Sequence, residues 1–186
     1  ATSEEIRPVP DNLAKALGAN LVFTRLSGHG RTGAAMAEPS AADWMHDTLE
    51  ALAAGRAVGD KVIVVSTSTG GTLVAAASLR EDAMKDVIGS IFVSPNFAIN
   101  SPAAVILTWP AVRWWGPVVA GAQRALATIN ADHERYWTNS YPTVALMPMA
   151  ALVKAVDALD LSAAKIPALF VISDQDKVVN PTKNRA

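Results

Sequence analysis

The stretch VIVVSTSTGGTL, residues Val62 to Leu73, decides which fold the sequence predicts. Its four β-branched apolar residues predict a buried strand, and the small residues after the paired glycines predict a helix packed closely on a neighbour. Ser68 stands at the corner between the two. A nucleophilic serine needs an exposed hydroxyl and nearby backbone N–H donors, and a sharp strand-to-helix turn provides both. The pattern S-x-S-x-G, Ser66 to Gly70, therefore indicates a nucleophile at Ser68.

Two other interpretations of this turn stay open. A turn rich in serine and threonine can simply cap the helix that follows it. A glycine-rich loop that opens a helix can also cradle a phosphate group. The phosphate-binding P-loop, however, requires Gly-Lys-Ser/Thr, and no lysine lies near STSTGGT.

The rest of the chain alternates between strand and helix patterns. Apolar runs predict three further strands, at Asn20–Leu26, Asp86–Pro95 and Ala168–Ser173. Stop and start signals with helical spacing predict helices that end at Gly18, that run from Ser40 to Gly55, and that cover Val144–Leu159. Because the strands lack polar alternation, we expect an α/β fold with a mostly parallel sheet and helices on both faces.

The segment 96–143 interrupts this alternation. It holds four of the five tryptophans, both tyrosines and several prolines, and it predicts short helices without any strand. We interpret it as an insertion over the carboxyl edge of the sheet, where ligands bind in open α/β folds. The chain then divides into a first core part, 1–95, a helical cap or lid, 96–143, and a second core part, 144–186.

A second candidate site segment is SDQDKVV, Ser173 to Val179, which follows the last predicted strand. A carboxylate just past the carboxyl end of a strand can orient a histidine and stabilise its imidazolium form. A solvated turn with a capping aspartate is the alternative interpretation of the same residues.

Composition limits the classes of function. The chain has 186 residues, of which 51% are hydrophobic and 18% charged, so one domain with a sizeable core is expected. A net charge of −1 gives no broad field for nucleic acid, and the absence of cysteine excludes disulfides and Cys-ligated metals. The sequence contains no uncharged apolar run of about 18 residues, so it predicts no membrane span.

Four motifs, in this order, resemble those of the α/β-hydrolase superfamily: LSGHG, DWMHDTLEAL, VVSTSTGGTL and SDQDKVVNP. The closer similarity is to bacterial carboxylesterases and monoacylglycerol lipase-like serine hydrolases, and it spans nearly the whole chain. The resemblance implies a serine esterase or lipase-like enzyme that acts through an acyl-enzyme and needs no metal or organic cofactor. It also implies that the segment 96–143 is the cap.

The resemblance assigns roles to individual residues. Ser68 resembles the nucleophile, the backbone N–H of Thr69 resembles one oxyanion donor, and Asp176 resembles the acid. Asp174 is the second choice for the acid. The chain departs from the family pattern at two positions, because serines stand at 66 and 173 where the family usually has glycine.

The substrate is expected to be a small-molecule ester with an apolar acyl group. Apolar residues of the insertion are candidates for its pocket or lid: Phe97, Ile99, Leu107, Trp109, Trp114 and Trp115. The same residues can instead form the core of the lid or a dimer contact. The sequence leaves the oligomeric state open. An exposed aromatic patch could also place the cap at a membrane or lipid interface, but the segment is not strongly basic, so its charge does not support this alternative.

The same parts also serve a thioesterase, a peptidase or a C–C bond hydrolase, and a non-catalytic binder or scaffold can use the same fold. The sequence does not choose among these activities.

None of the three histidines, His29, His46 and His133, resembles the family base. His29 lies in the Gly-His-Gly loop, where the resemblance implies a structural role. The family histidine follows the acid, and its first oxyanion loop precedes the residue that is Ala1 here. We therefore expect these residues to be a fragment of a longer hydrolase, nearly inactive alone, with a histidine about 20–50 residues after Asp176.

Overall fold

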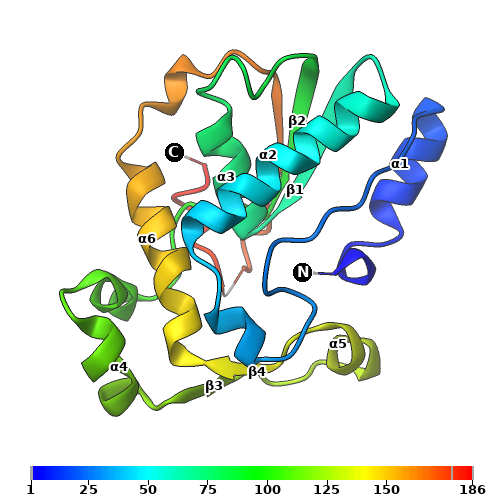
Figure 1. Cartoon of the computed structure of the whole chain (residues 1–186). Helices are drawn as coiled ribbons and strands as arrows, with labels where there is room; N and C mark the ends of the chain where they lie inside the picture. The colour runs from blue at the N-terminus through cyan, green and yellow to red at the C-terminus, as the bar shows by residue number, and fades with distance from the viewer. Residues whose placement is uncertain (1, 177, 186) are drawn as a thin grey trace.

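The computed structural model describes residues 2–176 and 178–185. Five strands and six α-helices are assigned in this part of the chain (Figure 1). The strands are β1 Val62–Thr67, β2 Val87–Val93, β3 Gln123–Ala125, β4 Ser140–Pro142 and β5 Ala168–Val171. The α-helices are α1 Val9–Leu17, α2 Ala41–Val58, α3 Thr69–Ala77, α4 Val112–Ala120, α5 Ala131–Tyr136 and α6 Leu146–Asp157. Short 3-10 helices lie at Ser3–Glu5, Ala34–Ala37, Pro102–Thr108, Thr143–Ala145 and Leu161–Ala163.

The main sheet has three parallel strands in the order β1-β2-β5. Thr67 pairs with Val93, and Val93 pairs with Val171, so the three strands end level with one another. Strands β2 and β5 match the predicted runs, and the parallel sheet confirms the predicted α/β class. All turns that leave the carboxyl ends of these strands therefore start from one edge.

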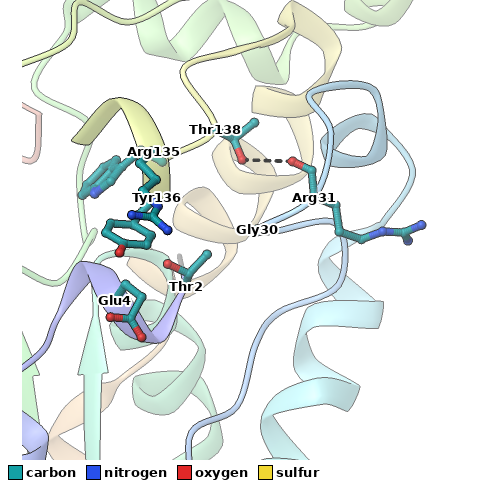
Figure 2. A pocket seen from close by; sticks show the side chains of 8 residues that line it. Thr2, Glu4, Gly30, Arg31, Arg135, Tyr136 and Thr138 are labelled. Atoms are coloured by element: carbon teal, nitrogen blue, oxygen red, sulfur yellow. Dashed lines mark hydrogen bonds between the residues drawn. The ribbon is translucent and has the colours of Figure 1, made fainter. Parts of the chain in front are cut away.

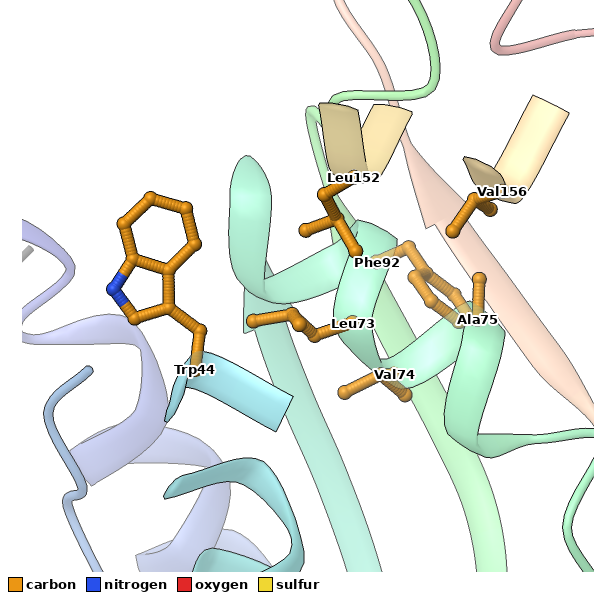
Figure 3. Close-up of a cluster of buried hydrophobic side chains, with 7 residues drawn as sticks. All are labelled: Trp44, Leu73, Val74, Ala75, Phe92, Leu152 and Val156. Atoms are coloured by element: carbon orange, nitrogen blue, oxygen red, sulfur yellow. The ribbon is translucent and has the colours of Figure 1, made fainter. Parts of the chain in front are cut away.

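A layer of three helices covers one face of this sheet. Helices α2, α3 and α6 pack together there and enclose a cluster of buried side chains (Figure 3): Trp44, Leu73, Val74, Ala75, Phe92, Leu152 and Val156. The Trp44 indole N–H also donates to the Ser27 carbonyl at 3.0 Å, so this buried ring has no unpaired polar atom. Three side chains of the cluster, Leu73, Val74 and Ala75, belong to α3, the helix that begins after Ser68.

The opposite face of the sheet carries apolar side chains that are open to solvent in the described structure. Ile63 of β1 and Leu169 and Val171 of β5 belong to this group. No helix within the described residues has the length and apolar character needed to cross a membrane.

The predicted start of α2 is confirmed, and its predicted end is wrong. Ser40 and Asp43 form a reciprocal capping box, in which the Ser40 N–H donates to Asp43 Oδ2 at 2.8 Å. The helix continues through Gly55 and ends at Val58. A Cβ atom on Gly55 would lie 3.2 Å from a methyl group of Val62, so this glycine permits close packing of α2 on β1 instead of stopping the helix.

The strand predicted over Asn20–Leu26 is wrong, because the structure forms no strand there. A strand requires a neighbouring backbone to receive its hydrogen bonds. Within the described residues, β1 is an edge strand that pairs with β2 alone, so residues 20–26 join no ladder. Leu21 and Val22 accordingly remain exposed. The prediction of a strand at residues 20–26 rested on their apolar composition alone, and that composition does not supply a neighbouring strand.

The segment 96–143 contains the predicted short helices but also a pair of strands that the sequence did not indicate. Strands β3 and β4 are antiparallel and three residues long. Strands so short show no alternating pattern, and all of β3 is exposed. Figure 1 shows α4, β3, β4 and α5 in the lower part of the view, below the main sheet.

Candidate active site

The backbone of Ser68 has the most unusual conformation in the candidate site. Its φ of 51° and ψ of −121° lie outside the regions that L-residues normally occupy. Such strain costs on the order of 1–3 kcal/mol and persists only when the surroundings hold it in place. The Ser68 N–H donates to Val93 O at 3.2 Å, and the Ser68 carbonyl accepts from the N–H groups of Asn96 and Gly71, at 3.1 and 2.9 Å.

The hydroxyl of Ser68 does not cap the helix that it precedes. Ser68 is the N-cap residue of α3, yet its side chain accepts no capping hydrogen bond. Ser68 is partly exposed, and Thr69 is the first residue of α3, so the Thr69 N–H has no acceptor within the helix. The structure therefore does not support the simple capping interpretation of this turn.

Of the two glycines at this turn, Gly71 is the one that permits close packing. A Cβ atom on Gly70 would only reach ordinary contact with Ser66, at 4.0 Å, so the turn has room for the serine that replaces the usual family glycine at position 66. A Cβ atom on Gly71 would lie 2.8 Å from the Pro95 side chain. Gly71 thus lets α3 approach the segment that follows β2. The sequence pattern did not indicate which of the two glycines, Gly70 or Gly71, is needed for this close approach.

The carboxylate of Asp176 is held by the turn that follows β5. Its Oδ1 atom accepts from the N–H groups of Val178 and Val179, at 2.8 and 3.0 Å. The Asp176 N–H donates to Ser173 O at 3.2 Å. Asp174 differs, because its exposed carboxylate forms an ion pair with Arg185 at 2.5 Å. Asp176 is therefore the better oriented of the two candidate acids.

The structure places Ser68 and Asp176 beyond the same edge of the sheet. Ser68 directly follows β1, and Asp176 lies five residues beyond the end of β5. Adjacent strands lie about 4.8 Å apart, so the level ends of β1 and β5 are separated by about 10 Å, with β2 between them.

Comparison with known proteins assigns the family. The sequence profile described as "Alpha/beta hydrolase family" matches residues 4–186. The chain belongs to the alpha/beta hydrolase family. This membership confirms the predicted superfamily and the hydrolase class of fold.

Two solved structures share the fold of this alpha/beta hydrolase. One belongs to a study of LipS and LipT, described as metagenome-derived lipolytic enzymes, with a TM-score of 0.73 and 24% identity over 96% of this chain and 70% of that chain. The other is a monoacylglycerol lipase from Paleococcus ferrophilus, with a TM-score of 0.65 and 18% identity over 96% of this chain and 71% of that chain. No curated protein matches the chain.

The histidines of this alpha/beta hydrolase serve other contacts. Among the described residues, no histidine is hydrogen-bonded to Ser68 or Asp176. The ring of His46 is exposed and pairs with Glu50, and the ring of His133 lies against Trp137. His29 packs edge-on against the Trp44 ring, with 5.6 Å between centroids.

His29 is neutral at ordinary pH. Burial lowers the pKa of His29 to about 4, and its Nδ1–H donates to the Ser27 carbonyl at 3.2 Å. The same carbonyl accepts the Trp44 indole N–H. Asp47 holds the Ser27 N–H and hydroxyl, at 2.5 and 3.1 Å. These contacts fix the Gly-His-Gly loop on α2, which agrees with the structural role expected for His29.

A pH dependence of stability follows from His29. The unfolded chain binds a proton at this residue below a pH of about 6.5, whereas the folded protein binds it only near pH 4. We therefore expect the free energy of unfolding to decrease as the pH falls from 6.5 to 4, by up to about 3 kcal/mol from this group. Urea unfolding at pH 7 and pH 4.5 measures the change.

The matched variant for this measurement is His29→Asn, which keeps a side-chain donor without a titratable ring. We expect the variant to be less stable at pH 7 but to lose less stability between pH 7 and pH 4.5 than the parent chain. An equal loss in both proteins would contradict the assignment of this pH dependence to His29.

Two surface cavities lie away from Ser68 and Asp176. The first, of about 280 Å³, lies between the N-terminal residues, the Gly30 loop and α5 (Figure 2). In it the Arg31 side chain points outward and Thr138 donates to the Arg31 carbonyl at 3.5 Å. The second, of about 520 Å³, lies beside α2 and includes His46 and Asp47. Neither is lined by the apolar residues expected to bind an acyl chain.

Those apolar residues fall into two groups. Phe97 packs against the rings of Phe92 and Phe170, and Ile99 forms a β-bridge with Val179, so both belong to the segment beside Asp176. The others lie farther along the segment 96–143: Leu107, Trp109, Trp114 and Trp115. Trp115 contacts Trp109 and donates to the Pro110 carbonyl at 2.9 Å, whereas Trp114 is 77% exposed.

The described residues contain no group of three or more His, Cys, Asp or Glu side chains placed to bind a metal ion.

Proposed function

We propose that this chain carries the nucleophile and the acid of a serine hydrolase that cleaves carboxylic esters through an acyl-enzyme. The observation that carries the proposal is the placement of a strained, partly exposed Ser68 and an oriented Asp176 beyond one edge of a parallel sheet. Membership of the alpha/beta hydrolase family and the fold shared with lipolytic enzymes support it.

In the proposed reaction, Ser68 Oγ attacks the ester carbonyl carbon and its proton passes to a histidine. The Thr69 N–H donates to the oxyanion of the tetrahedral intermediate. The histidine then returns the proton to the alcohol that leaves, and water releases the acid from the acyl-enzyme by the same steps. Asp176 accepts a hydrogen bond from the histidine and stabilises the imidazolium that forms in each half-reaction.

The base is the part of the mechanism that the described histidines do not supply. None of them is hydrogen-bonded to Ser68 or Asp176 in the described structure, so we propose a histidine from outside residues 1–186. Such a ring must reach between the ends of β1 and β5. The second oxyanion donor is proposed to come from outside these residues as well.

The segment 96–143 is proposed to act as the cap that selects the substrate. Phe97 and Ile99 lie beside the Asp176 turn, and the exposed tryptophans offer apolar surface for an acyl chain. An ester with an apolar acyl group is therefore the proposed substrate class. Thioesters and other substrates of serine hydrolases would require the same Ser68 and Asp176.

A non-catalytic binding protein is the second candidate function. The lack of a described histidine at Ser68 favours it, because a serine without a base is a poor nucleophile. A single experiment separates the two candidates. It treats the natural polypeptide that contains these 186 residues with a fluorophosphonate probe, which labels only an activated serine.

We expect stoichiometric labelling that maps to Ser68 and disappears in Ser68→Ala. The matched control is Ser173→Ala, which removes an exposed hydroxyl at the other end of the site and should label normally. A panel of p-nitrophenyl esters of graded acyl length then ranks the substrates. A folded natural polypeptide that fails to label would favour the binding protein.

A further inference from the structure

We infer that residues 96–100, here called the strap, set the position of Asp176 relative to Ser68, with Thr72 and Asn100 as positioning residues. The inference rests on the proposed function, because it concerns the geometry of the proposed nucleophile and acid. The strap follows β2, the strand that separates β1 from β5, and it contacts the candidate site at both of its ends.

The first end of the strap is fixed to the Ser68 turn. The Asn96 N–H donates to the Ser68 carbonyl at 3.1 Å, and the Asn96 carbonyl accepts from Thr72 Oγ1 at 2.6 Å. Thr72 is 0% exposed and Asn96 is 3% exposed, so water does not compete with this bond. Pro95 is also buried and packs against Gly71. Thr72 thus holds Asn96, which in turn holds the strained carbonyl of Ser68.

The second end of the strap is fixed to the Asp176 turn. The Asn180 N–H donates to Ala98 O at 2.8 Å, and the Asn100 N–H donates to Val178 O at 3.0 Å. These bonds flank the antiparallel bridge between Ile99 and Val179. The Asn100 side chain also donates to the Asp176 carbonyl at 3.4 Å.

The residues held by the strap are those that hold the Asp176 carboxylate. The N–H groups of Val178 and Val179 donate to Asp176 Oδ1, while the carbonyl of Val178 and the bridge position of Val179 belong to the strap contact. A shift of the strap would therefore move the carboxylate and not only the surface of the turn.

The middle of the strap is anchored as well. Phe97 packs against Phe92 of β2 and Phe170 of β5, with 6.3 Å between ring centroids in each case. Four residue steps from Asn96 to Asn100 span at most about 14 Å. A short segment that is fixed at both ends and in its middle acts as a spacer of set length between the two candidate catalytic residues.

We expect the loss of a hydrogen bond at either end of the strap to lower kcat with little change in KM. In Thr72→Val, which keeps the side-chain shape, the Asn96 carbonyl loses its donor. In Asn100→Ala, the Asp176 carbonyl loses its side-chain donor. We expect each variant to lower kcat for a hydrolysed p-nitrophenyl ester by the order of 10-fold, since small misplacements at reacting groups have effects of this size or larger.

Controls separate positioning from folding. Thr72→Ser keeps the hydroxyl and should retain kcat within about 3-fold, although it removes a buried methyl group. Asn20→Ala is matched to Asn100→Ala, because Asn20 is also exposed and donates through its side chain to a carbonyl, that of Val58. Asn20→Ala should leave kcat unchanged. Thermal unfolding of every variant verifies that the protein is folded under the assay conditions.

The decisive measurement is a double-mutant cycle with Asp176→Asn in the natural polypeptide. If Asn100 acts through Asp176, Asn100→Ala should lower kcat in the parent protein but have little further effect in the Asp176→Asn background. Full additivity of the two effects would overturn the inference that the strap positions Asp176. A parent-like kcat in both Thr72→Val and Asn100→Ala would overturn it as well. A parent-like kcat in Asp176→Asn itself would instead overturn the proposed function.

Discussion

Replacing Ser68 by alanine is expected to lower kcat/KM for a p-nitrophenyl ester by about 10⁴- to 10⁶-fold in the natural polypeptide that contains this chain. The reason is that the attacking oxygen disappears and no acyl-enzyme can form. The Thr69 N–H and the substrate contacts remain, so a small residual rate over the uncatalysed reaction is also expected. Stopped assays at high enzyme concentration measure both values.

The fold should tolerate this substitution. The backbone of Ser68 forms hydrogen bonds with Val93, Asn96, Gly71 and Thr72, and alanine retains all of them. Alanine also meets the same steric cost as serine at a φ of 51°. A loss of activity accompanied by a large loss of thermal stability would therefore argue against a chemical role. Activity equal to that of the parent protein would end the proposal for Ser68.

Replacing Asp176 by asparagine is expected to lower kcat by about 10³- to 10⁴-fold. Asparagine retains an Oδ1 acceptor for the N–H groups of Val178 and Val179, so the turn should stay folded. The charge that stabilises an imidazolium is lost, and the amide favours the wrong tautomer of the histidine. Steady-state kinetics with the same ester should therefore show the loss in kcat.

Asp174→Asn is the matched control for this prediction. Asp174 lies two residues earlier in the same turn and pairs with Arg185 at the surface. Exposed ion pairs contribute little to stability, and we expect kcat to change by less than about 2-fold. A large loss in Asp174→Asn with a small loss in Asp176→Asn would exchange the two assignments.

Local signals in the sequence predicted several elements because each depends on near neighbours in the chain. The capping box at Ser40 and Asp43 uses atoms three residues apart. The end of α1 depends on Gly18, which adopts a left-handed φ of 62°. The runs that became β1, β2 and β5 are mostly apolar and lack strict polar alternation, as is typical of parallel strands. These features needed no knowledge of distant contacts.

The incorrect predictions concern features that depend on distant parts of the chain. Residues 20–26 have the composition of a strand but no neighbouring strand in the described structure. Gly55 was predicted to end α2, but its lack of a side chain instead allows α2 to pack closely against Val62 of β1. Gly70 and Gly71 look equivalent in the sequence, and only the approach of Pro95 gives Gly71 the crowded position.

The sequence by itself determined the turn at Ser68, the acidic turn that carries Asp176, and the family to which both patterns belong. The tertiary structure alone decided that the two turns lie beyond one edge of the sheet, that Asp176 is the oriented carboxylate, and that the strap joins them. The physical reason is range. Turn chemistry is set by residues a few positions apart, whereas strand order and the contacts of residues 96–100 with residues 178–180 depend on packing between segments about 80 residues apart in the chain.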